Sequence, residues 1–384
     1  MKVVYILHSV LMGGATISFI NMVVGLMTRG ITPIVFLPHA KNGAELKESL
    51  QKNNISFIET DIVSSIINRP QNIKSLPGYV KRALFLPYNK QKSYRSLKQL
   101  IQSINPDIIH TNTGVVHEGF HIAHELKIPH VWHLREYQTR DFHWKIYPSF
   151  SKFCSYLRKS YVVTITDDIR HYFHLDNYSA AQTIYNGIYH SNEVCYIDKK
   201  ERYFLLASRV SPEKGHLDVI KAFADFSGKD KYKLKILGFG HEPFMNKIKE
   251  LADSLGCLDC IEFLGYQSDV RPYMSRAKAL VVASPNEGFG RMTAEALFCG
   301  TLVIGRNTAG TKEILSNTGG LTFNTIEEMT QMMEYVNVMS DSDYKEQALH
   351  AQKVTVASYS IESNIDKVYS LYKQINSKDS ESHN

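Results

Sequence analysis

The length, composition and charge of the chain exclude several classes of protein. Its 384 residues exceed the size at which one core keeps growing, so about two domains are expected. Hydrophobic residues make up 43% and charged residues 21%, values typical of globular proteins and not of disordered or fibrous ones. No segment reaches the roughly 18 apolar residues of a membrane span, so we expect a soluble or peripheral protein.

The five cysteines predict reduced thiols inside a cell, because they are odd in number and scattered along a long chain. They are Cys154, Cys195, Cys257, Cys260 and Cys299. Cys257 and Cys260 form a CxxC pair, but no second pair or histidines at zinc-ligand spacing follow it. We therefore expect no metal or redox site there.

The first residues have two interpretations. Lys2 precedes an apolar run that ends in small residues, as in a signal peptide, but His8 and Ser9 interrupt that run. A buried strand at 3–7, followed by a glycine turn and a helix from about Thr16, explains the same residues without a cleavage site.

Short apolar runs alternate with amphipathic stretches along the whole chain. Five lie in the first half, at 3–7, 33–37, 107–110, 130–134 and 161–166, and five in the second, at 204–208, 233–238, 261–265, 279–284 and 301–305. Near-continuous apolar strands separated by helices are typical of parallel sheets covered on both faces. The predicted fold class is α/β, with two doubly wound, Rossmann-like domains.

The predicted domain boundaries follow the polar stretch that begins at His190. We expect an N-terminal domain at 1–189, a C-terminal domain at 190–360, and a last segment at 361–384. The last segment should begin with an amphipathic helix, to about Ile375, that packs back toward the N-terminal domain. From Asn376 the polar residues predict a frayed tail.

The strand expected at 279–284 leads into a loop and helix suited to an anion. Two glycines, Gly288 and Gly290, allow a ligand to approach closely, and free N–H groups at the helix start favour a phosphate. Glu287 and Glu295 can accept hydrogen bonds from sugar and ribose hydroxyls. The alternative is an Arg291–Glu295 pair within the helix and a solvated Glu287.

Two cations follow the strand expected at 204–208. Arg209 offers a fork for phosphate oxygens and Lys214 a point charge, so together they can neutralise a diphosphate. The alternative is a helix start with Ser211 as cap and Pro212 in the first position. That alternative leaves the two cations unexplained, because cations oppose the dipole at a helix N-terminus.

Three segments together resemble glycosyltransferase family 4, a group of retaining enzymes with the GT-B fold. They are SRVSPEKGH at 208–216, SPNEGFGRMTAEALFCGTLVIG at 284–305 and NTAGTKEIL at 307–315, in the family's order and spacing. Weaker N-terminal features are Gly13-Gly14, the run at 106–110 and the run at 184–188. The resemblance implies two domains facing across a cleft, a nucleotide-sugar donor, most often a UDP-sugar, and no cofactor.

The resemblance also implies roles for the matching residues of the second half. Arg209 and Lys214 are expected to bind the donor diphosphate and stabilise its charge. Glu287 is expected to hold donor sugar hydroxyls and Glu295 the ribose. The neighbouring positions with expected contacts to sugar, phosphate or base are Gly288, Phe289, Gly290, Thr293, Ala294 and the Gly265-Tyr266 turn.

In the first half the resemblance places Gly13 and Gly14 near the diphosphate and His133 near the sugar. The alternative for His133 is a histidine buried under Trp132. Family members often carry an acid directly after this histidine, whereas Leu134-Arg135-Glu136 follows it here. The role of Glu136 is therefore left open.

The mechanism implied by the resemblance is attack on the same face of the sugar, with the leaving phosphate accepting the acceptor's proton. The protein then contributes position and charge, and needs no metal. Asp341-Ser342-Asp343 matches the DxD of metal-dependent transferases, but Glu346 follows at the spacing of a capping box, so we predict helix capping.

Four other functions are considered. A sugar-nucleotide epimerase or a phosphorylase would share the fold, and a non-catalytic nucleotide-sugar-binding protein would share the site. An NAD enzyme is disfavoured because the first strand is followed by Gly13-Gly14 instead of GxGxxG.

The net charge of +6 comes from two stretches that contain no acid. Between Asp61 and Asp107 the cations are Arg69, Lys74, Lys81, Arg82, Lys90, Lys92, Arg95 and Lys98. Between Asp141 and Asp167 the cations are Lys145, Lys152, Arg158 and Lys159, among the aromatic residues Phe142, Trp144, Tyr147, Phe150, Phe153 and Tyr156.

Basic residues mixed with aromatic ones suit the interface of an anionic membrane. Family members commonly act on lipid-linked or membrane-bound acceptors. We therefore expect a cytoplasmic protein at the inner face of the cell membrane, with a lipid-linked or glycan acceptor and no nucleic-acid partner. The alternative is that the aromatic residues are core and the cations merely solvated.

Overall fold

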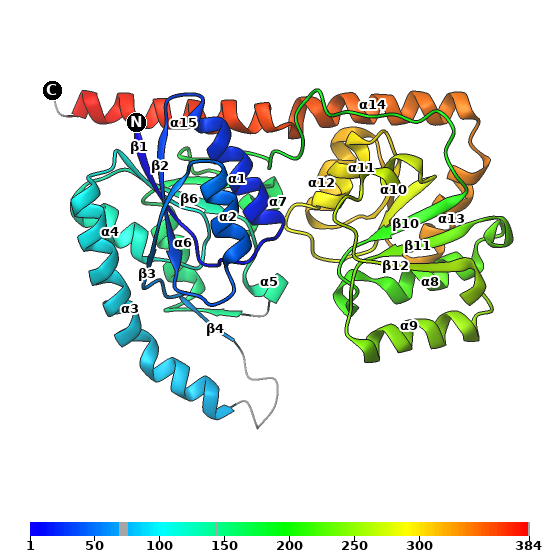
Figure 1. The fold of residues 1–384 in the computed structure, drawn as a ribbon, viewed down its shortest axis with the longest axis horizontal. Helices are drawn as coiled ribbons and strands as arrows, with labels where there is room; N and C mark the ends of the chain where they lie inside the picture. The colour runs from blue at the N-terminus through cyan, green and yellow to red at the C-terminus, as the bar shows by residue number, and fades with distance from the viewer. Residues whose placement is uncertain (69–75, 143, 383–384) are drawn as a thin grey trace. The chain divides into compact units, whose positions relative to one another are not determined.

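The computed structural model describes residues 1–68, 76–142 and 144–382. The chain forms two compact units, each with its own sheet (Figure 1). The first unit consists of Met1–Gly187 and Ile361–Asn384, and the second of Ile188–Ser360. The C-terminal helix therefore belongs to the same unit as the N-terminal residues.

The first unit is built on a seven-stranded sheet of order β3-β2-β1-β5-β6-β8-β9, in which every pairing is parallel. Its strands are β1 (Lys2–Ile6), β2 (Thr32–Pro38), β3 (Ser56–Thr60), β5 (Ile108–Thr111), β6 (His130–Leu134), β8 (Tyr161–Thr164) and β9 (Ala181–Thr183). A separate antiparallel pair joins β4 (Ile66–Asn68) to β7 (Trp144–Ile146).

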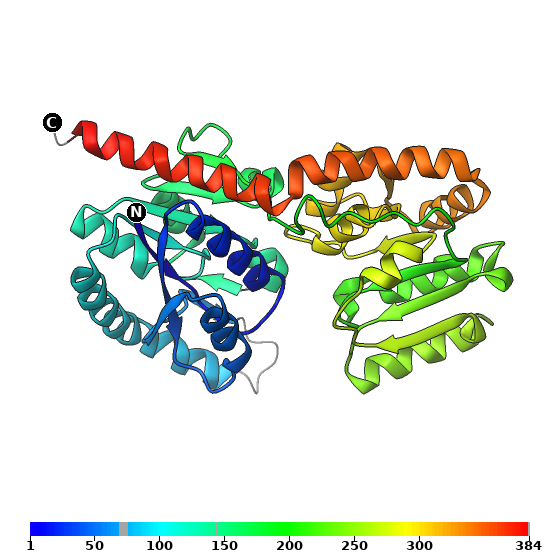
Figure 2. The ribbon, with the colours of Figure 1, turned by 45° about the horizontal axis from the view of Figure 1, so that its top comes forward.

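Helices cover both faces of this sheet. Successive side chains of a strand point to opposite faces, and here both sets are apolar and need burial. Val3 and Tyr5 face a core with α1 (Gly14–Met27), α2 (Ala44–Lys52) and α15 (Ile361–Ser382). Val4 and Ile6 face a second core with α3 (Leu76–Ile104) and α4 (Glu118–Leu126). Figures 1 and 2 show α15 running beside α1. The shorter helices are α5 (Thr139–Phe142), α6 (Phe150–Leu157) and α7 (Asp167–Tyr172).

The second unit has a six-stranded parallel sheet of order β12-β11-β10-β13-β14-β15. The strands are β10 (Tyr203–Ala207), β11 (Lys233–Leu237), β12 (Ile261–Gly265), β13 (Ala279–Val282), β14 (Val303–Arg306) and β15 (Leu321–Phe323). One face packs on α8 (His216–Asp225), α9 (Glu242–Ser254) and α13 (Ile326–Val338).

The remaining helices of the second unit are α10 (Arg271–Arg276), α11 (Arg291–Phe298), α12 (Ala309–Thr318) and α14 (Asp341–Tyr359). Helix α11 contacts β13 and β14, α12 contacts β14 and β15, and α14 packs against both helices. Three 3-10 turns occur at Pro212–Lys214, Lys229–Lys231 and Leu258–Cys260.

The predicted α/β class with two parallel sheets is confirmed, and the ten apolar runs all contain a strand. Five short strands were not identified from the sequence, namely β3, β4, β7, β9 and β15. They have three to five residues each, and such short segments carry no clear periodicity.

Two predictions about the C-terminal region need correction: the frayed tail, and the residues that cap the helix beginning at Asp341. The stretch from Asn376 is not a frayed tail, because α15 continues to Ser382; no Pro or Gly interrupts the chain after Ile361. Asp341 and Asp343 do begin α14, but the cap is Ser340, whose hydroxyl accepts from the Asp343 amide at 3.1 Å. Glu346 lies one turn too late for the capping box.

Over the ranges given above, no helix is long and apolar enough to cross a membrane.

Candidate functional site

The three motifs of the second unit follow three neighbouring strands. The segment 208–216 follows β10, the segment 284–300 follows β13, and the segment 307–315 follows β14. Because parallel strands end at the same edge of a sheet, the motifs share that edge. It is also the edge at which open α/β sheets bind their ligands.

Two glycines allow these motifs to pack closely on one another. Gly215 has φ +73°, and a Cβ atom there would lie 2.6 Å from the carbonyl oxygen of Ala283. Gly290 has φ +86°, and a Cβ atom there would lie 3.1 Å from Oγ1 of Thr311. A side chain at either position would force the loops apart.

Lys214 and Glu287 meet at this edge although 73 residues separate them. The Lys214 ammonium lies 2.5 Å from Oε1 of Glu287, and about a fifth of each side chain is exposed. Arg209 instead pairs with Glu213 at 2.7 Å, and both of these side chains are mostly exposed. The structure thus brings Lys214 to Glu287 and pairs Arg209 with Glu213.

Glu295 has a different environment from Glu287. It is buried, and Nε of Arg291 donates to its carboxylate at 2.6 Å. Burial raises the pKa of Glu295, and the Arg291 charge opposes that rise. The Arg291–Glu295 pair of the alternative interpretation is therefore present, whereas the merely solvated Glu287 of that interpretation is wrong.

The residues between the two glutamates form the start of α11. Gly290 is the N-cap and contributes no side chain, so the first turn is open to a ligand from its backbone side. Thr293 and Ala294 are fully buried, and Phe289 is nearly so. The amide of Gly310 donates to the Glu287 carbonyl at 2.9 Å, which fixes the loop against α12.

Two exposed aromatic rings stand at the ends of β11 and β12. Tyr266 is 66% exposed and Phe239 is 70% exposed, and their rings stack at 6.1 Å with an interplanar angle of 19°. Tyr266 was expected to contact the base, whereas Phe239 was not identified from the sequence. An aromatic residue between two glycines at a strand end is the signal that would have identified Phe239.

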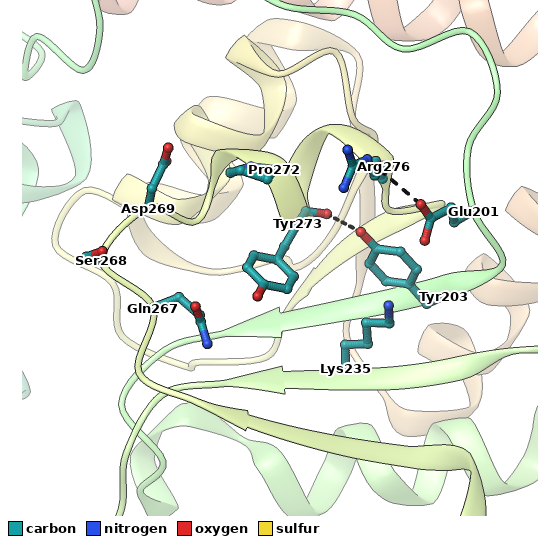
Figure 3. Close-up of a pocket in the computed structure, with 9 residues that line it drawn as sticks. All are labelled: Glu201, Tyr203, Lys235, Gln267, Ser268, Asp269, Pro272, Tyr273 and Arg276. Atoms are coloured by element: carbon teal, nitrogen blue, oxygen red, sulfur yellow. Dashed lines mark hydrogen bonds and ion pairs between the residues drawn. The ribbon is translucent and has the colours of Figure 1, made fainter.

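The residues that follow Tyr266 in the chain help to line a pocket of about 400 Å³ (Figure 3). It lies between strands β10 and β11 and helix α10, and its lining residues are Glu201, Tyr203, Lys235, Gln267, Ser268, Asp269, Pro272, Tyr273 and Arg276. The Lys235 ammonium lies 4.2 Å from the centroid of the Tyr203 ring. None of the residues singled out from the sequence lines this pocket.

In the first unit, a buried arginine joins three loops at the carboxyl edge of the sheet. Nε of Arg135 donates to Oδ1 of Asn112 at 2.9 Å, and Nη1 donates to Oδ1 of Asn186 at 2.7 Å. Burial lowers the pKa of Arg135 to about 10. Asn112 follows β5, and Asn186 belongs to the segment after β9, so Arg135 holds these loops at the end of β6.

Glu136 lies beside this arginine. Its carboxylate accepts from the Thr113 hydroxyl at 3.0 Å. Burial raises the pKa of Glu136, while Thr113 and Arg135 oppose the rise. Arg135 and Asn186 lie in segments that the sequence already marks, at 134–136 and 184–188, but no role was predicted for them, and Asn112 was not identified. The signal was a polar residue directly after an apolar run.

His133 is fully buried in β6, as the alternative interpretation expected, yet its hydrogen bonding is incomplete. Nδ1 lies 3.2 Å from Nε2 of His110, whereas Nε2 has no hydrogen-bond partner. Burial lowers the pKa of both histidines well below the ordinary value, and the charge of Arg135 lowers it further. Both imidazoles are therefore neutral at physiological pH.

Gly13 is the N-cap residue of α1, and Gly14 is the first residue of that helix. A Cβ atom on Gly13 would meet nothing within 4 Å. Gly13 and Gly14 thus add no side chain at the start of α1, and a ligand could approach the backbone there.

The two basic stretches differ in exposure. The N-terminal part of α3 exposes apolar and basic residues together, whereas Phe153 of α6 is fully buried and stacks on His117 at 4.8 Å. Lys90 is not a surface cation, because it pairs at 2.7 Å with the buried Glu118. Arg69 and Lys74 lie outside the described residues, as does the side chain of Phe142.

Within the parts of the chain that the structure covers, no three His, Cys, Asp or Glu side chains are grouped as metal ligands.

Comparison with known proteins identifies two family models along the chain. The model described as Glycosyltransferase Family 4 matches residues 12–192, and the model described as Glycosyl transferases group 1 matches residues 192–354. The two matches adjoin and together extend over both units.

Similar proteins include an uncharacterized glycosyltransferase, MJ1178, of Methanocaldococcus jannaschii. It is 26% identical over 268 residues, which cover 68% of this chain and 70% of that protein. The alpha-monoglucosyldiacylglycerol synthase of Streptococcus pneumoniae is 34% identical over 124 residues, which cover 32% of this chain and 28% of that enzyme.

Among solved structures, that of Anabaena Alr3699/HepE in complex with UDP has the same fold. Its TM-score is 0.76 at 17% identity, over 97% of this chain and 100% of that chain. This likeness establishes the GT-B architecture.

Proposed function

The chain belongs to glycosyltransferase family 4, and we propose that it is a retaining enzyme with a UDP-sugar donor. It would transfer a hexosyl or N-acetylhexosaminyl group to a lipid-linked or glycan acceptor, in the synthesis of a surface polysaccharide or another glycoconjugate. The HepE protein of the same fold was solved with UDP, which supports the choice of uridine.

The observation that carries this proposal is the ion pair between Lys214 and Glu287. It joins the two charged motifs at the ligand-binding edge of one sheet, where each group has a plausible partner in a nucleotide sugar. Lys214 would bind a phosphate oxygen, and Glu287 would accept hydrogen bonds from sugar hydroxyls. In the structure the Lys214 ammonium and the Glu287 carboxylate pair with each other, so both groups already lie where the donor would bind.

The charge that develops on the leaving diphosphate would be stabilised from several sides. Arg209 is exposed, and its guanidinium can leave Glu213 for a phosphate, because an exposed ion pair of this kind contributes little. The open start of α11 adds backbone N–H groups and the positive end of the helix dipole. With this charge supplied by the protein, we propose that transfer needs no metal ion.

Further residues are proposed for other parts of the donor. The stacked rings of Phe239 and Tyr266 are suited to a nucleobase, because aromatic faces stack on bases. Glu295 would bind ribose hydroxyls. In the first unit, the start of α1 at Gly13 and Gly14 would contact the diphosphate, and His133 the transferred sugar.

We also propose that the N-terminal half of α3 binds an anionic membrane surface. Its exposed apolar residues recur every four positions along the helix and so lie on one face, at Leu76, Val80, Leu84 and Tyr88, with Phe85 beside them. Lys81 and Arg82 are exposed between them. Figure 1 shows this half of α3 extending beyond the sheet that covers its other half.

Exposed apolar groups next to cations match a bilayer with anionic lipid, where each cation contributes about 1 kcal/mol. The relative from Streptococcus pneumoniae is named for a diacylglycerol product, which supports a lipid acceptor here. The enzyme would then work at the inner face of the cell membrane.

Nucleotide binding by two glutamate variants tests the assignment of the site. UDP, GDP and dTDP are first compared by thermal shift, since a ligand that binds only the folded state raises the melting temperature. Glu295→Gln should weaken binding of the preferred nucleotide, whereas Glu287→Gln should preserve it and slow transfer. The opposite pattern would exchange the two roles.

Turnover distinguishes the proposal from other functions of the same fold. Release of UDP from UDP-glucose should persist with excess EDTA. An epimerised sugar nucleotide in place of free UDP would indicate an epimerase, and binding without any turnover would indicate a binding protein.

A further inference from the structure

Four fully buried side chains form a continuous hydrogen-bond chain in the first unit. Tyr5 comes from β1, His110 from β5, His133 from β6 and Tyr372 from α15. The Tyr372 hydroxyl lies 3.2 Å from the Tyr5 hydroxyl and 2.6 Å from Nδ1 of His110, and Nε2 of His110 lies 3.2 Å from Nδ1 of His133. We refer to these four residues as the buried hydrogen-bond chain.

The direction of this chain follows from its tyrosine end. The Tyr372 hydroxyl donates to the Tyr5 hydroxyl. A hydroxyl has a single hydrogen, so toward His110 the Tyr372 oxygen can only accept. Nδ1 of His110 therefore carries a proton and donates it to Tyr372.

The remaining proton positions follow because both histidines are neutral. A neutral imidazole has one N–H and one lone pair, so Nε2 of His110 carries the lone pair. Nδ1 of His133 must then be the donor between the two rings. Nε2 of His133 is left unprotonated, as a hydrogen-bond acceptor.

His130, which lies in β6 with His133, has a hydrogen-bond partner on each of its two ring nitrogens. Its Nε2 lies 2.8 Å from the Thr111 hydroxyl, and its Nδ1 lies 3.1 Å from the Ser160 hydroxyl. His133 has a partner on one nitrogen only, and its free Nε2 is buried. A buried acceptor without a partner is costly, so such a lone pair is expected where a ligand supplies the donor.

We propose that Tyr5, Tyr372 and His110 are positioning residues that hold His133 as the Nδ1–H tautomer, so that Nε2 accepts a hydrogen bond from a hydroxyl of the bound sugar. The proposal rests on the proposed function, in which His133 contacts the transferred sugar. It makes the C-terminal helix part of the apparatus that recognises the sugar, although Tyr372 is 262 residues from His110. A sugar that lacks this hydroxyl would leave the acceptor unpaired and would be rejected.

The tautomer is measured directly by NMR of protein labelled with 15N in histidine, because protonated and unprotonated imidazole nitrogens have well-separated 15N shifts. The His133 signals are assigned by their loss in His133→Gln. In the wild type, Nδ1 of His133 should be protonated and Nε2 unprotonated. Protonated Nε2 in the wild type would overturn the proposal.

Tyr5→Phe tests whether the distant hydroxyl controls the tautomer. Without its acceptor, the Tyr372 hydroxyl should turn and donate to Nδ1 of His110. The proton then moves to Nε2 of His110, which donates to His133, and Nε2 of His133 becomes protonated. Tyr372→Phe should release the same constraint, since it leaves the His110 N–H without an acceptor.

Tyr178→Phe is the matched control, because it removes a partly buried hydroxyl of the same unit that donates to the Ser160 carbonyl at 2.9 Å. It should leave the His133 shifts unchanged. If Tyr5→Phe and Tyr372→Phe also leave the shifts unchanged, the buried hydrogen-bond chain has only a structural role and the proposal is wrong.

Two further readouts separate this proposal from the proposed function. In Tyr5→Phe, release of UDP from UDP-glucose should slow by roughly tenfold, the effect of one mispaired buried hydrogen bond, while the affinity for UDP stays the same. Equal loss of UDP affinity and turnover would argue against positioning of the sugar. If the wild type neither binds UDP nor hydrolyses UDP-glucose but shows the expected tautomer, the proposed function fails and the assignment of the proton positions stands.

Discussion

Replacement of Lys90 by Met removes the cation that neutralises a buried carboxylate. In the structure the Lys90 ammonium lies 2.7 Å from Oε1 of Glu118 and also donates to the Ser65 hydroxyl. Only 2% of the Glu118 side chain is exposed, and its Oε2 has no hydrogen-bond partner. Removal of Lys90 leaves a buried charge without compensation.

The expected loss in the free energy of unfolding is about 3–5 kcal/mol, the range for breaking a buried pair on one side. Lys92→Met is the matched control. Lys92 lies two residues away and pairs with Asp61 at 3.0 Å, but 64% of its side chain is exposed. An exposed pair of this kind contributes about 0–1 kcal/mol, so the two variants should differ by several kcal/mol.

The penalty should also depend on pH. Burial already raises the pKa of Glu118, and Lys90 lowers it. Without Lys90 that pKa rises further above the value in the unfolded chain, so the folded state binds a proton more tightly than the unfolded state. The free energy of unfolding then falls as the pH rises from the Glu118 pKa of the unfolded chain to that of the folded state. The loss in Lys90→Met should therefore be smaller at pH 5 than at pH 8.

Urea unfolding followed by tryptophan fluorescence measures this effect in the relevant unit. The chain has two tryptophans, Trp132 and Trp144, and both lie in the first unit. Addition of Glu118→Gln to Lys90→Met should restore much of the stability. Equal losses for Lys90→Met and Lys92→Met, or a loss that does not change with pH, would refute the account of a buried uncompensated charge.

Three other predictions concern the second unit and the membrane surface. Lys214→Ala and Arg209→Ala should each reduce kcat for UDP release by on the order of 10²-fold, as for other preorganised charges; turnover near the wild-type rate would remove that residue from the proposed role. Gly310→Ala should destabilise the second unit by about 1–3 kcal/mol and weaken UDP binding, because a Cβ atom there would lie 2.4 Å from the Phe289 carbonyl oxygen. Unchanged UDP affinity would show that the 288–290 loop does not depend on this contact. The double variant Lys81→Ser, Arg82→Ser should weaken salt-sensitive binding to vesicles that contain anionic phosphatidylglycerol and preserve UDP affinity. The control double variant Lys145→Ser, Lys159→Ser should have less effect on vesicle binding. A wild type that does not bind such vesicles at low salt would favour a soluble acceptor.

The exposure of side chains in the two basic stretches could not be predicted from the sequence. Both stretches mix cations with aromatic residues, and the sequence offers no means to tell them apart. In the structure Phe153 of α6 packs into the core, whereas Phe85 and Tyr88 in the N-terminal half of α3 remain exposed. Exposure depends on what other elements cover a helix, and that covering comes from distant parts of the chain.

The sequence by itself determined the α/β class, the two parallel sheets, the family and the order of its motifs. These features are local: apolar runs mark buried strands, and each motif is a short segment directly after one of them. The same locality explains why the Arg291–Glu295 pair could be predicted, since four residues along a helix bring two side chains together.

Only the tertiary structure decided which charged and polar groups meet across long stretches of chain. Lys214 pairs with Glu287 because β10 and β13 are neighbours in the sheet. Tyr372 reaches His110 because α15 packs on the same face as Tyr5. Strand order and helix packing set these partners, and they arise from the sum of many weak contacts in two cores, which no short segment of sequence encodes.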